Sequence, residues 1–285
     1  MTTIRAMLFD LDGTLLHSAP DLVGSLNWVR HTENLPPLPV AEMQRFASKG
    51  AAGLLKAGMP KADDILFESW RQRFLEHYAD NSYRDSTLFD GVPALLDFLV
   101  GQGIPWGIVT NKPEALTFPI VTAAKLEATV SCVVCGDTLA ESKPHPAPVS
   151  LACGMVDVAP AATLFVGDDV RDIQAGRAAG TQTAAVYYGY GSDELDDGCV
   201  GDRNRVKHPA DLIALVKKHN GCDGREGVEH APVLWGAGAE DQPGFPDFPG
   251  IRTCRQGRSA TGLVRAVRGR GRDLFRLFGR GSGAP

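Results

Sequence analysis

Short apolar runs alternate with amphipathic stretches along most of the chain. Each run has the length and the β-branched content typical of a strand buried on both faces, and each is followed by a helical pattern. The predicted strands are Ala6–Phe9, Trp106–Val109, Cys132–Cys135, Thr163–Val166 and Thr183–Tyr187. The predicted helices between them are Val92–Val100, Pro113–Ala124, Ala147–Cys153 and Asp172–Ala179. This alternation predicts an α/β fold, a Rossmann-like three-layer sandwich in which helices cover both faces of a parallel sheet.

One connection is much longer than the others and is predicted to be helical. From Leu16 to about Asp85 no strand pattern occurs, whereas connections in α/β units usually have about 2 to 6 residues. Helical patterns cover Asp21–Thr32, Val40–Ala47, Gly50–Ala57 and Ala62–Tyr78. We therefore expect an inserted all-helical domain at residues 17–85, between two parts of the core at residues 1–16 and 86–220.

Residues 221–285 differ in composition from the rest of the chain. They hold ten arginines, no lysine and seven acidic residues, and 14 of the 32 glycines, whereas residues 1–220 carry 19 basic and 27 acidic residues. We expect this Arg/Gly-rich tail to be largely disordered. Its charge would suit contact with nucleic acid or an anionic membrane, but a solvated extension without function is the alternative that we favour.

Polar side chains follow the predicted strands at the point where each strand ends. Asp10 and Asp12 follow the first strand, Thr110 and Asn111 the second, and Asp168 the fourth. Lys143 and Asp169 lie in the loops that follow the third and fourth strands, and Asp172 begins the helix that follows the fourth. Because ligands of open parallel sheets bind outside the carboxyl ends of the strands, these side chains are predicted to converge at one edge.

The convergence of carboxylates, a hydroxyl and a lysine predicts a magnesium and phosphate site. Mg²⁺ prefers hard oxygen ligands, commonly one or two carboxylates with water and a phosphate oxygen. Asp10 can both ligate the metal and attack phosphorus, and Asp12 can serve as general acid and then as general base. Thr110 and the backbone N–H of Asn111 would hold a phosphate oxygen, while Lys143 would neutralise charge in the transition state.

These residues resemble the four motifs of the haloacid dehalogenase superfamily. The matching segments are Asp10-Leu-Asp12-Gly13-Thr14, Val109-Thr110-Asn111, Lys143-Pro144 and Gly167-Asp168-Asp169-Val-Arg-Asp172, within residues 1–218. Leu15–Leu22, Gly136–Pro148 and Leu164–Gly180 are similar to the phosphoglycolate phosphatase branch, whose helical cap is inserted after the first motif. Ile104–Pro113 and Leu164–Ile173 are also similar to N-acetylmuramic acid 6-phosphate phosphatases, and the sequence leaves the choice between these two groups open.

The resemblance implies a cytoplasmic, Mg²⁺-dependent phosphatase that acts through an aspartyl-phosphate on Asp10. It also implies that Asp10, the Asp12 carbonyl and Asp168 bind the metal, that Asp172 supports Lys143 or the metal's waters, and that Asp169 ligates through water. Lys49 and Gly50 look like the cap loop that points into the core, where Lys49 could bind a substrate carboxylate. Position 17 is His where this branch usually has Asp, so its effect on the cap hinge stays open.

Two other functions are compatible with these motifs. A sugar phosphomutase of the same fold and a non-enzymatic phosphate- or nucleic-acid-binding protein are the alternatives. Cys132 and Cys135 form a C-x-x-C without a second pair, which we interpret as part of a buried strand rather than a zinc or redox site. No signal peptide or membrane-spanning run is predicted, the expected partner is a small phosphorylated metabolite, and pairing of cap helices would permit a homodimer.

Overall fold

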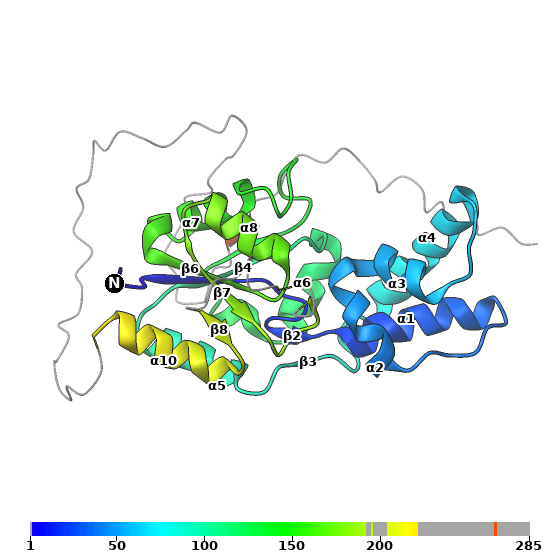
Figure 1. Ribbon diagram of the computed structural model, residues 1–285, viewed down its shortest axis with the longest axis horizontal. Helices are drawn as coiled ribbons and strands as arrows, with labels where there is room; N and C mark the ends of the chain where they lie inside the picture. Colours follow the sequence, from blue (N-terminus) through cyan, green and yellow to red (C-terminus); the bar gives the residue numbers. More distant parts are fainter. Residues whose placement is uncertain (1, 192–194, 196–203, 222–264, 267–285) are drawn as a thin grey trace, which may run out of the picture.

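The computed structural model describes residues 2–191, 195, 204–221 and 265–266, and its central element is a parallel sheet (Figure 1). Within these residues the strand order is β8-β7-β6-β1-β4-β5-β9, and every pairing is parallel. The strands are β1 (Ala6–Phe9), β4 (Trp106–Val109), β5 (Cys132–Val134), β6 (Thr163–Gly167), β7 (Gln182–Val186), β8 (Arg205–Val206) and β9 (Arg265–Ala266). The five predicted runs therefore all form strands, with ends that shift by one residue at most.

Helices cover both faces of this sheet, because successive side chains of a strand point to opposite sides. Met7 and Phe9 belong to the hydrophobic cluster that contains α5 (Val92–Gly101), α6 (Glu114–Ala123) and α10 (Pro209–His219). Leu8, between them, belongs to the second cluster, with α7 (Ala147–Met155) and α8 (Val170–Ala178). Short 3₁₀ helices at Leu126–Ala128 and Pro160–Ala162 precede β5 and β6. The predicted three-layer α/β fold is confirmed.

The two cysteines of the C-x-x-C follow the same alternation. Cys132 lies in one hydrophobic cluster and Cys135 in the other, so their side chains face opposite sides of the sheet. Burial raises the pKa of each thiol to about 12, which keeps both protonated at neutral pH. This arrangement fits the interpretation of the motif as a buried strand.

The cap is a separate group of helices at one end of the molecule (Figure 1). It consists of α1 (Ala19–Thr32), α2 (Val40–Met43), a 3₁₀ helix (Gln44–Lys49), α3 (Gly50–Gly58) and α4 (Asp64–Asn81). Leu26, Leu54, Trp70 and Phe74 form part of its buried interior. The α-helix predicted over Val40–Ala47 is wrong beyond Met43, where the chain tightens into the 3₁₀ helix before the left-handed turn at Gly50 (φ 63°).

Two short strands, which the pattern did not predict, join the cap to the core. β2 (Leu16–His17) pairs antiparallel with β3 (Thr87–Leu88), and two residues are too few to give a visible period. The buried carboxylate of Asp21, at the start of α1, accepts the backbone N–H groups of Arg84, Asp85 and Ser86 at 2.9–3.0 Å. These bonds fix the chain that enters the cap to the chain that leaves it.

The C-terminal part of the described chain contains two strands and a helix that the pattern did not predict. β8 and α10 extend the core beyond the last predicted strand, and α10 begins with a capping box formed by His208 and Asp211. In the tail, Arg265–Ala266 form β9 against the edge strand β5, although no strand was predicted there. The rest of the tail lies outside the described residues. Among the described helices, none has the length and apolar character needed to cross a membrane.

Candidate active site

Three buried carboxylates meet where β1 and β6 end. Phe9 pairs with Val166, so Asp10 and Asp168 leave neighbouring strands side by side, and the Asp10 N–H donates to the Val166 carbonyl at 2.9 Å. Asp172, from the first turn of α8, joins them, and one carboxylate oxygen from each of Asp10, Asp168 and Asp172 lies within 4.8 Å of the others. The expected convergence at this sheet edge is therefore present for these three side chains.

Lys143 is the cation that contacts this cluster. Its ammonium donates to Asp10 Oδ1 at 2.6 Å, to Asp172 Oδ1 at 2.7 Å and to the Val109 carbonyl at 2.8 Å, which uses all three of its N–H groups. Burial disfavours the charged ammonium, but the charges of Asp10 and Asp172 outweigh that effect and keep the pKa of Lys143 above its ordinary value. Lys143 therefore stays a cation in the site.

Asp168 is held mainly by backbone groups. Its Oδ2 accepts the N–H groups of Tyr190 and Gly191 at 2.9 Å, and its Oδ1 accepts the Thr14 hydroxyl at 3.1 Å. Gly13 passes so close that a Cβ there would lie 2.2 Å from Asp168 Oδ2, and its φ of +91° also favours glycine. The Gly13 in the first motif is thus required by both conformation and space.

The cluster carries more negative charge than Lys143 compensates. Burial, with the neighbouring charges of Asp10 and Asp172, raises the pKa of Asp168 well above its usual range. The pKa of Asp172 is raised by burial as well, against the opposing effect of Lys143. Three buried carboxylates beside one lysine form a site of hard oxygen atoms with excess negative charge. Such a site fits a divalent cation such as Mg²⁺.

Thr110 and Asn111 follow β4 at the same edge. The Thr110 hydroxyl accepts the Lys112 N–H at 3.2 Å. The Asn111 side chain donates to the Lys143 carbonyl at 2.9 Å and accepts the Lys143 N–H at 3.0 Å. Sequence reasoning assigned only the backbone of Asn111, whereas the structure shows that its amide side chain fixes the loop that carries Lys143.

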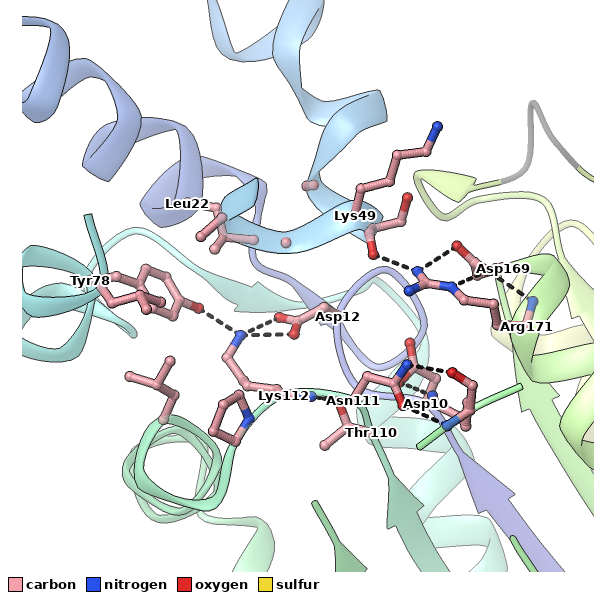
Figure 2. A pocket seen from close by; sticks show the side chains of 18 of the residues that line it. Asp10, Asp12, Leu22, Lys49, Tyr78, Thr110, Asn111, Lys112, Asp169 and Arg171 are labelled. Carbon is pink, nitrogen blue, oxygen red and sulfur yellow. Dashed lines mark hydrogen bonds and ion pairs between the residues drawn. The ribbon is translucent and has the colours of Figure 1, made fainter. Parts of the chain in front are cut away.

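Lys112 is a residue that sequence reasoning missed. Its ammonium lies 2.8 Å from both carboxylate oxygens of Asp12 and 2.9 Å from the hydroxyl of Tyr78, a cap residue on α4 (Figure 2). Burial opposes its charge, but Asp12 and Tyr78 keep the pKa of Lys112 above its ordinary value. Its position directly after Thr110-Asn111, at a strand end, was the available signal.

Arg171 is the second residue that was missed, and it connects the core to the cap. It donates to both carboxylate oxygens of Asp169 at 2.8 Å and to the Ser48 carbonyl in the cap at 2.7 Å (Figure 2). Burial raises the pKa of Asp169, but the hydrogen bonds from Arg171 outweigh it, so the pKa lies below the usual range. Asp169 also caps α8, and it is turned toward Arg171 rather than grouped with the three clustered carboxylates.

A cavity of about 270 Å³ lies between the strand ends and the cap. From the core it is lined by Asp10, Asp12, Thr110, Asn111, Lys112, Pro113, Leu116, Lys143, Asp169, Arg171 and Asp172. From the cap it is lined by Leu22, residues 47–51, Phe74, Leu75 and Tyr78. Lys49 and Gly50 are thus at the cavity as expected, although the Lys49 ammonium points away from Asp10 and Asp12 (Figure 2).

His17 lies at the hinge and is linked to Asp168 through one tyrosine. Its Nδ1 shares a 2.6 Å hydrogen bond with the Tyr190 hydroxyl, which also accepts the Ala19 N–H at 3.0 Å. Its ring lies against Phe89 and Tyr190, with centroids 5.4 Å and 5.6 Å away. Burial lowers the pKa of His17, so the hinge holds a neutral imidazole, while the backbone of Tyr190 binds Asp168.

Comparison with known proteins assigns the chain to the same family that the motifs resemble. The family model described as haloacid dehalogenase-like hydrolase matches residues 7–186. The chain is 38% identical over 216 residues, which are 75% of it and 96% of the relative, to an N-acetylmuramic acid 6-phosphate phosphatase of Pseudomonas aeruginosa. It is 37% identical over 239 residues, 84% of this chain and 98% of the relative, to a phosphoglycolate phosphatase of Xanthomonas campestris pv. campestris.

A solved structure supports this result. The crystal structure of a predicted phosphoglycolate phosphatase from Haemophilus somnus is similar, with a TM-score of 0.67 and 31% sequence identity, over 75% of this chain and 99% of that one. The resemblance stated from the motifs is thereby confirmed. The chain belongs to the haloacid dehalogenase-like hydrolases, as a phosphoric monoester hydrolase similar to phosphoglycolate phosphatases.

Proposed function

We propose that this protein hydrolyses a small phosphorylated metabolite through an aspartyl-phosphate formed on Asp10. The observation that carries the proposal is that Asp10 lines the cavity, with Oδ1 fixed by Lys143 at 2.6 Å. That bond leaves Oδ2 as the oxygen that can attack phosphorus. Covalent catalysis of this kind divides one difficult hydrolysis into two easier displacements.

Asp12 is the proposed acid and base. In the first step the bond between Asp10 and phosphorus forms, the bond to the leaving oxygen breaks, and that oxygen takes a proton from Asp12. In the second step Asp12 takes a proton from water, the water oxygen attacks phosphorus, and Asp10 is released with inorganic phosphate. This proposal is supported by the position of Asp12, which lines the same cavity as Asp10.

Three groups are proposed to bind the phosphoryl oxygens. The hydroxyl of Thr110 and the N–H of Asn111 lie at the end of β4, next to β1. The Lys143 ammonium would stabilise negative charge on the transferring group, because a positioned cation in a buried site interacts more strongly than it would in water. The Asn111 side chain contributes indirectly, since it holds the backbone of Lys143.

The residues present fit a magnesium ion. Asp10, Asp168 and the main-chain carbonyl of Asp12 are the proposed ligands, with Asp172 supporting Lys143 and Asp169 contacting the ion through water. When bound, the ion would offset the excess negative charge of the cluster and polarise the phosphoryl group. Asp172 fits a supporting role, because its Oδ1 binds Lys143 and its Oδ2 accepts the Asp169 N–H at 3.1 Å.

The names of the relatives suggest two substrates, phosphoglycolate and N-acetylmuramic acid 6-phosphate. Both carry a carboxylate in addition to the phosphate, so a cation in the cap is a reasonable second contact. Lys49 is the proposed cation, and it would have to turn its flexible side chain into the cavity. A panel of phosphorylated metabolites, scored by kcat/KM for the wild type and for Lys49→Met, would identify the substrate and test this contact.

The decisive experiment is to replace the nucleophile and to trap the intermediate. Asp10→Asn should lose turnover and phosphoenzyme formation while remaining folded, and Asp97→Asn, on the exposed face of α5, is the matched control. A beryllium fluoride adduct of the wild type should lie on Asp10. Turnover by Asp10→Asn at a rate near that of the wild type would exclude the mechanism. Accumulation of an isomeric sugar phosphate without inorganic phosphate would indicate a mutase instead.

A further inference from the structure

The Lys112 ammonium is fully occupied by oxygen atoms from the core and the cap. Both carboxylate oxygens of Asp12 and the Tyr78 hydroxyl lie 2.8–2.9 Å from it, which accounts for its three N–H groups. The side chains of Lys112 and Asp12 are only 7% and 18% exposed, so water has little access to the ion pair. A buried ammonium that lost a partner would be costly, since an unsatisfied charged group is penalised by several kcal/mol.

Tyr78 is the cap's contribution to this group. It lies on α4, is 1% exposed, and its ring stacks on Phe74 with centroids 6.3 Å apart. The Lys112 ammonium also lies 4.7 Å from the centre of the Tyr78 ring. The hydroxyl reaches Lys112 only while the cap lies against the core, so the set of three oxygen partners is complete only with the cap closed.

This geometry bears on how Asp12 can act. An ammonium that binds both oxygens of a carboxylate fixes the orientation of that carboxylate, whereas the proposed reaction requires Asp12 to turn toward the leaving oxygen. Asp12 can be released from Lys112 only if Lys112 keeps another partner. The Tyr78 hydroxyl is such a partner, because it already accepts one of the three N–H groups.

We propose that Tyr78, acting through Lys112, is a positioning residue for Asp12 and couples cap closure to proton transfer. The inference rests on the proposed function, in which Asp12 protonates the leaving oxygen. With the cap against the core, Lys112 binds both Asp12 and Tyr78, so that when Asp12 turns toward the leaving group, Lys112 keeps the Tyr78 hydroxyl as a partner. Without the hydroxyl, the Asp12 carboxylate would be the only hydrogen-bond acceptor of the Lys112 ammonium among those described, so Asp12 would be held more firmly in its present orientation.

The leaving group gives a readout that a merely structural defect would not produce. An alkyl oxygen must be protonated as it leaves, whereas p-nitrophenolate leaves without a proton. The kcat/KM value covers the steps up to formation of the phosphoenzyme. Tyr78→Phe should therefore lower kcat/KM for an alkyl phosphate more than for p-nitrophenyl phosphate, and the ratio of the two values should fall about threefold to tenfold, part of what a general acid contributes.

The test uses the full chain with Mg²⁺, p-nitrophenyl phosphate, and either 2-phosphoglycolate or N-acetylmuramic acid 6-phosphate, whichever the wild type hydrolyses faster. Tyr83→Phe removes a phenolic hydroxyl from the cap outside the cavity lining and should leave the ratio unchanged. In a Lys112→Met background, Tyr78→Phe should have no further effect, because residues that act through one another are not additive. Lys56→Met, at an exposed position of α3, controls for the loss of a lysine.

The outcomes separate this inference from the proposed function. If the wild type hydrolyses none of these three phosphate esters, the proposed function itself fails. If the wild type is active but Tyr78→Phe leaves both kcat/KM values unchanged or lowers them equally, Tyr78 does not act on proton transfer and the inference is overturned. The same conclusion follows if the Tyr78→Phe effect persists at full size in the Lys112→Met background.

Discussion

Replacement of Asp168 by Asn should make the metal-free protein more stable. The carboxylate of Asp168 is buried next to Asp10 and Asp172, and these causes raise its pKa from 3.8 to about 8. The folded state therefore binds a proton more tightly than the unfolded state, and the stability contributed by this group is lost as the pH rises from about 4 to about 8. Asn carries no charge and avoids that loss.

The hydrogen bonds of Asp168 can survive this substitution. The amide oxygen of Asn can accept the N–H groups of Tyr190 and Gly191, and its NH₂ group can donate to the Thr14 hydroxyl, where Asp168 now accepts. The electrostatic gain is then not offset by an unpaired polar group. Asn has almost the same shape as Asp, so no cavity forms.

The magnitude follows from the pKa shift. Raising the pKa of Asp168 from 3.8 to about 8 corresponds to roughly 5–6 kcal/mol at most, because each pKa unit is equivalent to about 1.4 kcal/mol. Because the pKa of neighbouring Asp172 is raised as well, the two carboxyls do not titrate independently, so we halve this value to about 2–3 kcal/mol. For a protein of this size that gain corresponds to an increase in Tm of roughly 4–10 °C.

Thermal unfolding in EDTA from pH 6 to pH 9 measures the effect. The difference between Asp168→Asn and the wild type should grow with pH up to about 8 and then level off. Asp169→Asn is the matched control with the opposite sign, because Arg171 lowers the pKa of Asp169 and its charge stabilises the fold. Added Mg²⁺ should stabilise the wild type and not Asp168→Asn. If Asp168→Asn is less stable than the wild type in EDTA at pH 8, the reasoning is wrong.

Further predictions concern the metal, two other positions and the thiols. EDTA should abolish phosphatase activity and Mg²⁺ should restore it; turnover that persists in chelator would remove the ion from the mechanism. Gly13→Ala should lose Mg²⁺-induced thermal stabilisation, since its Cβ would lie 2.2 Å from Asp168 Oδ2. Asp21→Ala should lower the free energy of unfolding by about 2–4 kcal/mol in urea titrations, because the buried N–H group of Ser86 and the part-buried N–H group of Arg84 lose their acceptor. Cys132, whose pKa is raised to about 12 by burial, should resist iodoacetamide at pH 8 in the folded protein, and fast alkylation there would contradict its burial.

The pattern of apolar residues along the chain was enough to predict the core strands and the residues that follow them. A strand buried on both faces needs a continuous apolar run, so each run was visible, and the residue that follows a run is placed at the sheet edge by the parallel topology. Asp10 and Asp168 follow from this rule. The helical period likewise predicted helices between residues 17 and 85, where the structure has α1 to α4, whereas β2 and β3, with two residues each, were too short to show a period.

The partners of these residues were decided only by the tertiary structure. Lys112 lies 100 positions from Asp12 and 34 from Tyr78, and Arg171 lies 123 positions from Ser48, so no local pattern could pair them. The contact between Lys112 and Asp12 exists only once two strand ends lie side by side in the sheet, and the contacts with Tyr78 and Ser48 exist only once the cap lies against the core. The sequence thus determined which chemical groups reach the sheet edge, and the packing of cap on core determined which charges they meet there.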